Sequence, residues 1–472
     1  MDRKKFYIGG EWVEPVNQET INVINPATEE IVSVISNGNA HDLDKAVKSA
    51  RNAFISFSQT SKKEKIKLLN RICENYEKRK KDIADIIRIE MGAPIKLANG
   101  SQTNLGLQHL KTAIRVLEEH NFEFNHNNLL IRHEPIGVCG LITPWNWPVN
   151  QIMAKLGPSI ASGCTSILKP SEIAPGSAMI IAEIIDASDV PPGVFNLING
   201  YGNSIGEAIS SHQDIDMVSI TGSNKAGIAV AKGAADTVKR ISQELGGKSA
   251  NIIFDDDDFE KNVTRGVKGC MNNTGQSCNA PTRMLIPDSR ITEALSIAKE
   301  ACDSLITGEP SNENTDIGPQ VSDIQFNKVQ KLINQGIKEG AKLVIGGTGR
   351  PDGLETGYYS RPTLFSDVTE KMSIFREEIF GPVLCIISYK DIDDAISIAN
   401  NSPYGLASFV SGKNREQLIE CARRIRAGQV HINYKGGGTD APFGGFKKSG
   451  NGREKAEWGL EEFLEIKAIM MD

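Results

Sequence analysis

The sequence lacks the basic excess and the long apolar run that mark two large classes of protein. Its 53 Lys and Arg residues are outnumbered by 59 Asp and Glu, and the net charge of −6 argues against a nucleic-acid partner. No run of roughly 18 apolar residues occurs, and no apolar stretch follows the charged start Met1–Lys5. We therefore expect a cytoplasmic protein without a signal peptide, a membrane span or a membrane partner.

The cysteines and histidines also lack the spacings that mark metal sites or disulfide frameworks. The eight cysteines are scattered without a CxxC pair, and the seven histidines lack the spacing of metal ligands. In a chain of this length such cysteines are typical of reduced thiols, not of a disulfide framework. The sequence predicts no metal site.

Two common nucleotide-binding motifs are missing. Gly200, Gly202 and Gly206 do not fit the G-x-G-x-x-G spacing, so the usual dinucleotide fingerprint is absent. Ser242 stands where a P-loop ending in Gly247-Lys248-Ser249 would need glycine. Any nucleotide site must therefore be built in another way.

Two loops leave alternatives open. Gly222 and Gly227 follow the strand-like run Met217–Thr221, where backbone N–H groups at a helix start could hold a pyrophosphate or simply form a turn. The four carboxylates Asp255–Asp258 could bind a metal, but a strand-to-helix loop with an Asp cap is the favoured interpretation.

The chain length and the order of strand-like and helical stretches predict an α/β protein of two or three domains. A chain of 472 residues is too long for one core, and from about residue 136 strand-like runs alternate with helical stretches. This pattern predicts a mostly parallel sheet with helices on both faces. The runs are Gly137–Ile142, Thr165–Lys169, Val194–Ile198, Met217–Thr221 and Ser249–Phe254, and a second α/β stretch over 255–445 adds Thr282–Pro287, Lys342–Ile345 and Val383–Tyr389.

Turn, periodicity and capping patterns predict the elements in the N-terminal part of the chain and in two peripheral segments. Short β runs around Gly9-Gly10 predict a hairpin, the spacing from Leu43 to Phe57 predicts a helix, and Ser61-x-x-Glu64 opens a second helix with a capping box. A further helix is expected to stop near Gly92. Residues 122–134 read as a long hairpin and 462–467 as an edge strand that is open to pairing with another subunit.

Two residues stand out as candidates for chemistry. Cys278 ends the polar segment Asn272–Cys278; a lone cysteine is usually buried core, but a polar loop with a glycine suits an accessible thiol. Glu244, which we expect to follow a helical stretch, precedes Leu245-Gly246-Gly247, where the backbone can approach a neighbour closely. A lone glutamate is usually a solvated surface charge, so the residues alone do not decide its role.

Seven sequence blocks resemble the aldehyde dehydrogenase superfamily, in the same order and over essentially the whole chain. They are Thr143-Pro144-Trp145-Asn146-Trp147-Pro148, Leu168-Lys169-Pro170-Ser171-Glu172, Thr221-Gly222-Ser223, Glu244-Leu245-Gly246-Gly247-Lys248, Asn273–Cys278, Glu378-Ile379-Phe380-Gly381-Pro382 and Pro442–Gly450. A chance match of the whole set is remote, so the resemblance is specific.

The resemblance implies a Rossmann-like parallel-sheet cofactor domain, a second α/β catalytic domain and a small β oligomerisation element. It assigns 1–121 and 136–246 to an NAD-binding domain and 247–454 to the catalytic domain that carries the nucleophile. It assigns 122–135 and 455–472 to an oligomerisation hairpin and strand. A homodimer or a homotetramer is expected.

The resemblance also implies the chemistry. Cys278 attacks an aldehyde, the Asn146 amide and the backbone N–H of Cys278 hold the oxyanion, and hydride transfer leaves a thioester. Glu244 is the expected general base that activates water to hydrolyse it. Relatives that pass the acyl group to coenzyme A lack this glutamate, so hydrolysis is favoured. A catalytically silent binding protein on the same fold would be expected to have lost one of these three groups.

For the cofactor, the resemblance implies that Lys169 and Glu172 hold the adenosine ribose. A carboxylate accepts a hydrogen bond from a free 2′-OH and repels a 2′-phosphate, which predicts NAD over NADP. Because Lys169 could still help to hold a phosphate, an NADP-linked semialdehyde dehydrogenase stays the alternative. The cofactor-binding residues implied are Ile142, Thr143, Pro144, Trp145, Lys169, Ser171, Glu172, Gly202, Gly206, Thr221, Gly222, Ser223, Leu245, Gly246, Glu378 and Phe380.

The substrate mouth departs from that of the fatty-aldehyde and acetaldehyde members, which carry larger apolar residues at Asn150, Gln151 and Ala154. This difference predicts a polar or bulky aldehyde. Lys435 could hold a substrate carboxylate, although a solvated lysine is the commoner outcome. The mouth residues implied are Trp147, Asn150, Gln151, Ser277, Asn279 and Tyr434.

Overall fold

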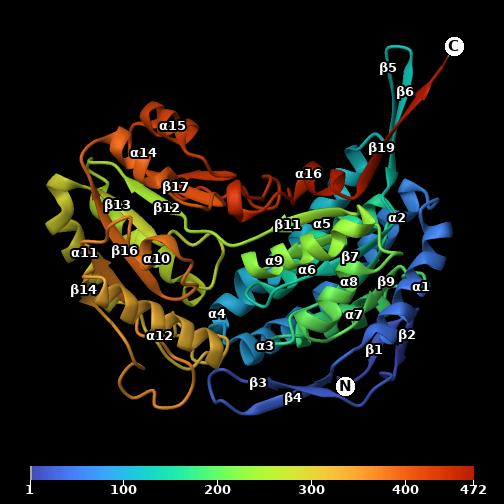
Figure 1. Ribbon diagram of the computed structural model, residues 1–472, viewed down its shortest axis with the longest axis horizontal. Helices are drawn as coiled ribbons and strands as arrows, with labels where there is room; N and C mark the ends of the chain where they lie inside the picture. Colours follow the sequence, from blue (N-terminus) through green and yellow to red (C-terminus); the bar gives the residue numbers. More distant parts are fainter. Residues whose placement is uncertain (1–2, 472) are drawn as a thin grey trace.

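Two seven-stranded sheets, each covered by helices on both faces, and a three-stranded arm form the computed structural model, which describes residues 3–471 (Figure 1). In the first sheet the strand order is β11 (Arg240–Glu244), β10 (Met217–Thr221), β7 (Val138–Ile142), β8 (Thr165–Lys169), β9 (Phe195–Leu197), β1 (Phe6–Ile8) and β2 (Glu11–Val13). The five strands from β11 to β9 are parallel, and β1 and β2 add an antiparallel hairpin at the edge.

The second sheet follows in the chain and is also mainly parallel. Its order is β14 (Lys342–Ile345), β15 (Thr363–Ser366), β16 (Val383–Tyr389), β13 (Arg283–Pro287), β12 (Ala250–Ile253), β17 (Ala407–Ser411) and β18 (Gln429–Ile432), with only β14 antiparallel to its neighbour. The chain passes from the first sheet to the second between β11 and β12.

Helices lie on both faces of each sheet because neighbouring strand residues point to opposite sides. In β8, Ile167 packs with α1 (Ala40–Phe57), α8 (Glu207–Ser211) and α9 (Asn224–Ala234), whereas Leu168 packs with the helices of the other face. That other face carries α2 (Lys62–Lys78), α3 (Lys80–Met91), α5 (Thr103–Glu119), α6 (Pro148–Ser162) and α7 (Gly176–Asp186), with the short α4 (Ile95–Leu97) leading into α5.

In the second sheet, Met284 and Leu285 of β13 divide in the same way between two cores. One core includes α10 (Phe259–Met271) and α11 (Ile291–Asp303); the other includes α12 (Asp323–Lys338), α13 (Ser373–Arg376), α14 (Ile392–Asn400) and α15 (Arg415–Arg424). The α/β class expected from the sequence, with helices on both faces, is thus confirmed.

A β arm projects from this body (Figure 1). It consists of β5 (Glu123–His126), β6 (Leu129–Pro135) and the C-terminal β19 (Leu464–Met470), which pairs antiparallel with β6 after the short helix α16 (Ala456–Glu461). The predicted hairpin and C-terminal strand are confirmed as elements. A separate ribbon of β3 (Thr20–Ile24) and β4 (Ile31–Ser36) was not predicted.

The local start and stop signals also hold. Ser61 and Glu64 form the reciprocal capping box of α2, and Gly92 ends α3 in the left-handed conformation at a φ of 76°. The loop Asp255–Asp258 leads from β12 into α10 as expected, but Asp258 at the helix start makes no side-chain cap bond. Instead the Asp256 carboxylate accepts the Asp258 N–H at 2.9 Å.

One prediction is wrong. Glu244 does not follow a helical stretch; it is the last residue of β11, which pairs parallel with β10 in full register. Four of the five residues of Arg240–Glu244 are polar, so the sequence does not indicate a buried strand, and hydrogen bonding in the sheet overrides this local preference.

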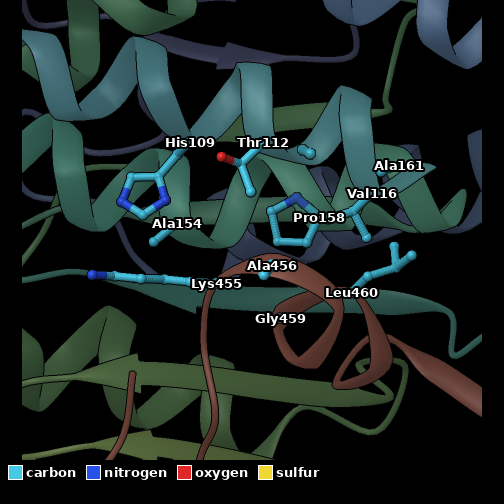
Figure 2. Close-up of a pocket in the computed structure, with 11 residues that line it drawn as sticks. His109, Thr112, Val116, Ala154, Pro158, Ala161, Lys455, Ala456, Gly459 and Leu460 are labelled. Carbon is cyan, nitrogen blue, oxygen red and sulfur yellow. The ribbon is translucent and has the colours of Figure 1, made fainter. Parts of the chain in front are cut away.

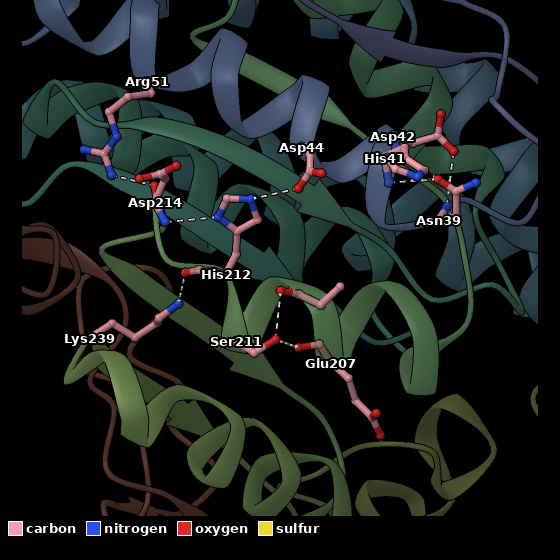
Figure 3. A network of polar contacts seen from close by, with 11 residues as sticks. Asn39, His41, Asp42, Asp44, Arg51, Glu207, Ser211, His212, Asp214 and Lys239 are labelled. Atoms are coloured by element: carbon pink, nitrogen blue, oxygen red, sulfur yellow. Dashed lines mark hydrogen bonds and ion pairs between the residues drawn. The ribbon is translucent and has the colours of Figure 1, made fainter.

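A polar network on the surface ties α1 to the loop after α8 (Figure 3). The His212 ring contacts the Asp44 carboxylate at 3.2 Å and accepts the Asp214 N–H at 3.0 Å. Arg51 and Lys239 donate to backbone carbonyls of the same loop, at 2.5 Å each. These contacts satisfy loop backbone groups that would otherwise rely on water, and they hold the loop that leads into β10.

Candidate active site

A cleft opens at the carboxyl ends of the first sheet. Ile142, Lys169, Thr221 and Glu244 are the last residues of β7, β8, β10 and β11, and all four line one cavity of about 370 Å³. Within the sheet, β7 has its next strand in the chain, β8, on one side and β10 on the other. Such a reversal of strand order is where open α/β sheets bind ligands.

Cys278 reaches this cleft on a tightly folded loop. Asn273, Thr274 and Gly275 are three consecutive residues with positive φ, at 54°, 59° and 69°. A Cβ on Gly275 would lie 2.1 Å from the Gly381 carbonyl oxygen, so only glycine fits there. The loop leaves Cys278 partly exposed in the cavity wall, while six of the other seven cysteines are buried.

Asn146 lies beside the nucleophile loop and is itself buried. Its Nδ2 donates to the Gln276 carbonyl at 3.0 Å, and its own carbonyl accepts from Gln102 at 2.9 Å and from Asn273 at 3.0 Å. Three hydrogen bonds thus fix the residue in the cavity wall. The side-chain amide has a second N–H available for a ligand oxygen.

Glu244 is 1% exposed, yet neither of its carboxylate oxygens has a hydrogen-bond partner in the described chain. A Cβ on Gly444 or Gly452 would lie 2.8 Å or 2.9 Å from Oε1, so two glycines make room for the carboxylate. An unpaired buried polar group is costly, which indicates a functional position.

Burial is the main reason why the pKa of Glu244 lies well above its ordinary value of 4.5. The nearby Glu454 carboxylate raises it further, whereas Lys155 and Arg453 act in the opposite direction. Lys155 forms a buried ion pair with Glu454 and also donates to Ser219 at 2.9 Å. Glu244 therefore binds a proton much more readily than an exposed glutamate.

Glu378 is the second carboxylate of the cleft. Its Oε1 accepts the Gly247 N–H at 2.9 Å, and a Cβ on Gly246 would lie 2.5 Å from its Oε2. The Gly-Gly pair that follows Leu245 therefore lets a backbone turn approach this carboxylate. Beside it, the Phe380 ring meets the Trp145 ring edge to face at 5.4 Å.

The cleft also sets the state of the Cys278 thiol. Desolvation raises its pKa to about 12, and the carboxylates of Glu378 and Glu244 add to this effect. The backbone N–H groups of Cys278 and Asn279 lower it. The free site thus keeps the thiol protonated at neutral pH, with backbone N–H donors next to the sulfur.

A partly buried ion pair lies at another part of the same wall. Lys169 is 3% exposed and donates to Glu172 at 3.0 Å and to the Pro170 carbonyl at 3.0 Å. Directly after β10, Ser223 caps α9 by accepting the Ala226 N–H at 3.2 Å. The cleft therefore offers a carboxylate and a helix N-terminus, which suit ribose hydroxyls and an anion.

Of the sixteen cofactor residues implied by the sequence, all except Gly206 line this cavity. The structure adds five that the motifs did not mark: Ile173, Ile220, Ala226, Gln325 and Lys328. Gln325 and Lys328 come from α12, far along the chain. Only their spacing of three on one helix could have hinted at a shared face, and such spacing is common.

The six residues assigned to the substrate mouth do not line the cofactor-side cavity. Trp147 Nε1 donates to Ser277 Oγ at 2.9 Å, and Asn150 Oδ1 pairs with His109 Nε2 at 2.8 Å. Gln151 is buried within α6, and Asn279 is half-buried next to the nucleophile.

Tyr434, the sixth residue assigned to the substrate mouth, packs against α10. A Cβ on Gly269 would lie 2.8 Å from its ring, Asn251 donates to its hydroxyl at 3.0 Å, and its ring tilts against that of Phe409 at 4.7 Å. Lys435, next in the chain, is exposed.

Within residues 3–471, no group of three or more His, Cys, Asp or Glu side chains is placed to hold a metal ion. Nor does any helix in this part of the chain combine the length and apolar character needed to cross a membrane.

Known proteins match this chain along its length. The model of the aldehyde dehydrogenase family covers residues 12–469. The chain is 52% identical over 470 residues to 3-succinoylsemialdehyde-pyridine dehydrogenase from a Pseudomonas species, spanning 99% of this chain and 98% of that protein.

Solved structures agree. A mutant of aldehyde dehydrogenase C from Pseudomonas syringae, in complex with NAD+ and octanal, is 50% identical with a TM-score of 0.99 over 99% of this chain and 97% of that one. The NAD+ complex of aldehyde dehydrogenase from Bacillus cereus is 34% identical with a TM-score of 0.96, over 100% and 96% of the two chains.

This chain belongs to the aldehyde dehydrogenase family. The resemblance carried by its seven sequence blocks is confirmed, and with it the class of enzyme, an oxidoreductase that acts on aldehydes.

Proposed function

We propose that this protein oxidises an aldehyde to the carboxylic acid, with NAD as hydride acceptor and Cys278 as covalent nucleophile. The observation that carries the proposal is the meeting of three groups in one cleft. They are the partly exposed thiol of Cys278, the fixed amide of Asn146 and the buried, unpartnered carboxylate of Glu244.

The walls of the cleft fit a dinucleotide. The hydroxyls of Thr143 and Thr221 are buried in the wall without a hydrogen-bond partner, as expected where a polar ligand supplies one. Gly222 and the start of α9 suit the phosphates, and Glu172 suits a ribose hydroxyl. When bound, NAD supplies an acceptor for the hydride. Because Lys169 already pairs with Glu172, a 2′-phosphate would have to break that ion pair, which favours NAD over NADP.

Acylation begins at sulfur. The proton on Sγ of Cys278 passes to water, the thiolate bonds to the carbonyl carbon, and the carbonyl oxygen takes up the negative charge. The second N–H of the Asn146 amide and the backbone N–H of Cys278 are the donors for that oxygen. As the oxyanion collapses, the carbon loses its hydrogen as hydride and becomes a thioester on Cys278.

Deacylation belongs to Glu244. Its carboxylate accepts a proton from water, the resulting hydroxide attacks the thioester carbon, and Cys278 leaves as thiolate with release of the acid. Its high pKa makes Glu244 a stronger base than an exposed glutamate, once it is ionised. Water, not coenzyme A, is therefore the proposed acyl acceptor.

The β arm is the proposed oligomerisation element. Ile466 and Met470 of β19 are 73% and 78% exposed, an unusual display of apolar side chains at the edge of a sheet. A homodimer or homotetramer would cover them, and light scattering that gives a monomer mass would contradict this part. The residue bounds of the domains and the cytoplasmic location stay predictions.

An aldehyde panel tests the whole proposal. Purified protein is incubated with NAD or NADP and a range of apolar, polar and aromatic aldehydes, and NAD(P)H absorbance is followed. We expect steady production of NADH with a polar or bulky aldehyde as the best substrate. Reduction of neither cofactor by any aldehyde would refute the activity, and a higher kcat/KM with NADP would refute the cofactor.

A further inference from the structure

Lys455 borders a small cavity between α5, α6 and α16 that is separate from the cofactor-side cleft (Figure 2). One end of the cavity is apolar, at Val116 and Leu460, and the other is polar, where the His109 ring and the Lys455 ammonium lie on the same side. Its volume of about 20 Å³ is that of one water molecule. The groups at its polar end are therefore more informative than its volume.

The Lys455 ammonium has few partners. Among residues 3–471 it forms no ion pair; Nζ donates to the Gly438 carbonyl at 3.2 Å and lies 4.9 Å from the centre of the Phe443 ring. The neighbouring carboxylate of Glu454 is already paired with Lys155. Two of the three N–H donors of Lys455 are thus free for another acceptor.

The backbone at this position is strained. Lys455 has φ 74° and ψ 154°, a region that is almost restricted to glycine, and Ala456 also has a positive φ of 47°. On one side Glu454 is fixed by two backbone hydrogen bonds to Phe443, at 2.7 Å and 2.9 Å, and on the other side α16 begins. A side chain kept where glycine would relieve strain indicates that the side chain is needed.

The cavity of Lys455 adjoins the residues next to the nucleophile. Trp147 donates to Ser277, the neighbour of Cys278, at 2.9 Å, and Asn150, three residues further along, pairs with His109, which lines this cavity together with Lys455. Burial lowers the pKa of Lys455, while Glu454, Cys278 and Glu244 raise it. Lys455 therefore lies on the α6 side of the nucleophile loop and contributes nothing to the cofactor-side cavity.

Its neighbours on the helices are polar but neutral. Burial lowers the pKa of His109 to about 3, with a further contribution from the Lys455 charge, so the ring is uncharged at neutral pH. His109 pairs with Asn150 of α6 at 2.8 Å. One turn further along α6, Ala154 is a small residue on the cavity wall and leaves room for the lysine stem. The region carries one unneutralised positive charge.

We propose that Lys455 is the anchor for a carboxylate at the far end of the aldehyde, so that the enzyme prefers oxo-carboxylates (semialdehydes with a free acid group). This inference rests on the proposed function and identifies its substrate class. It transfers the role that the sequence suggested for Lys435 to a lysine that shares a cavity with His109, the partner of the mouth residue Asn150. A charge-assisted hydrogen bond to a carboxylate is among the stronger polar contacts in proteins.

Matched pairs of substrates test the proposal. With NAD saturating, kcat/KM is measured for 4-oxobutanoate, 5-oxopentanoate and 6-oxohexanoate and for the methyl ester of each, which has the same reach without the charge. We expect the wild-type enzyme to prefer the acid of at least one pair by about 10-fold or more, and added salt to reduce that preference. The preferred length reports the distance from Lys455 to the reacting carbon.

Variants then identify the lysine. Lys455→Met keeps the length of the stem and removes the charge, and should abolish the preference for the acid, mainly through KM, while the ester loses little. Lys455→Arg should keep the preference. Lys435→Met, on the same C-terminal loop but exposed, should leave it unchanged.

The outcomes are distinguishable. If no aldehyde is oxidised, the proposed function fails. If esters and acids are oxidised equally well by the wild-type enzyme, the function stands and the carboxylate anchor is overturned. If Lys455→Met slows acids and esters in parallel, Lys455 only holds the loop at Gly438 and the proposal is overturned as well. The wild-type comparison needs no variant to fold.

Discussion

The cofactor-side cleft is built from strand ends, whereas the region around Lys455 is built from helix faces. Four neighbouring parallel strands end at the cofactor-side cleft, and glycines such as Gly246 bring backbone close to Glu378. The region around Lys455 instead uses side chains from α5 and α6 and a C-terminal segment. Strand ends are fixed by the sheet, so they can hold one cofactor accurately. A helix face can exchange side chains without moving the sheet, which suits a choice among substrates.

The largest expected effect comes from Cys278, which lines the cofactor-side cleft. Cys278→Ala should lower aldehyde oxidation by at least about 10⁴-fold, because the covalent intermediate cannot form. NAD affinity, measured by calorimetry, should change little. A variant that lost both together would show that the two regions are not separable at Cys278. Cys73→Ala, at the other partly exposed cysteine, is the matched control.

The next effect separates the two half-reactions. Glu244→Gln should allow a rapid burst of about one NADH per active site and then a steady state slower by about 10²- to 10⁴-fold, because hydrolysis loses its base. Stopped-flow absorbance measures both phases. Loss of the burst as well would mean that Glu244 is also needed for acylation, which would contradict a role confined to deacylation.

A smaller effect is confined to the cofactor side. Glu172→Gln removes the carboxylate that pairs with Lys169 and should raise the ratio of kcat/KM with NADP to that with NAD by about 10-fold. The choice between acid and ester substrates should not change. If both preferences moved, the cofactor side and the aldehyde side would be coupled.

The smallest effect concerns stability. Because the pKa of Glu244 is raised in the folded protein, the folded state holds a proton that the unfolded state releases above about pH 4.5, so stability falls as pH rises from there. Glu244→Gln does not titrate, and its Tm should gain a few degrees on wild type as pH increases from 5 to 8. Glu118→Gln, at an exposed position, should follow wild type at every pH. A constant difference across pH would contradict the burial of a titrating carboxylate.

Sequence patterns predicted the cofactor side much better than the aldehyde side. Strands β8, β10 and β16 have the residue bounds expected, and the motif residues at their ends line the cleft. These motifs are continuous in the chain because one strand and its loop supply each of them. Gln325 escaped prediction because it comes from a helix and acts by holding the carbonyls of Ile379 and Phe380, at 3.1 Å and 2.9 Å.

The position of Lys455 could not be predicted for a different physical reason. Its side chain is placed by a positive φ that no local sequence signal encodes, and by the pairing of Glu454 with Phe443. The run Arg240–Glu244 also lacks the alternation of polar and apolar residues that marks half-buried strands, so its sequence predicts a helical region although it forms β11. In both cases long-range contacts override local preference.

The pairing of Phe443 with Glu454 has a consequence for how the enzyme matures. Gly444 and Gly452, which enclose the Glu244 carboxylate, and Lys455 all belong to this late segment, while β19 must still return to β6. During synthesis the first sheet can form long before these residues leave the ribosome. A growing chain therefore carries the Cys278 thiol for many seconds without an enclosed Glu244 carboxylate, and the proposed active site is complete only when about thirty C-terminal residues have folded back.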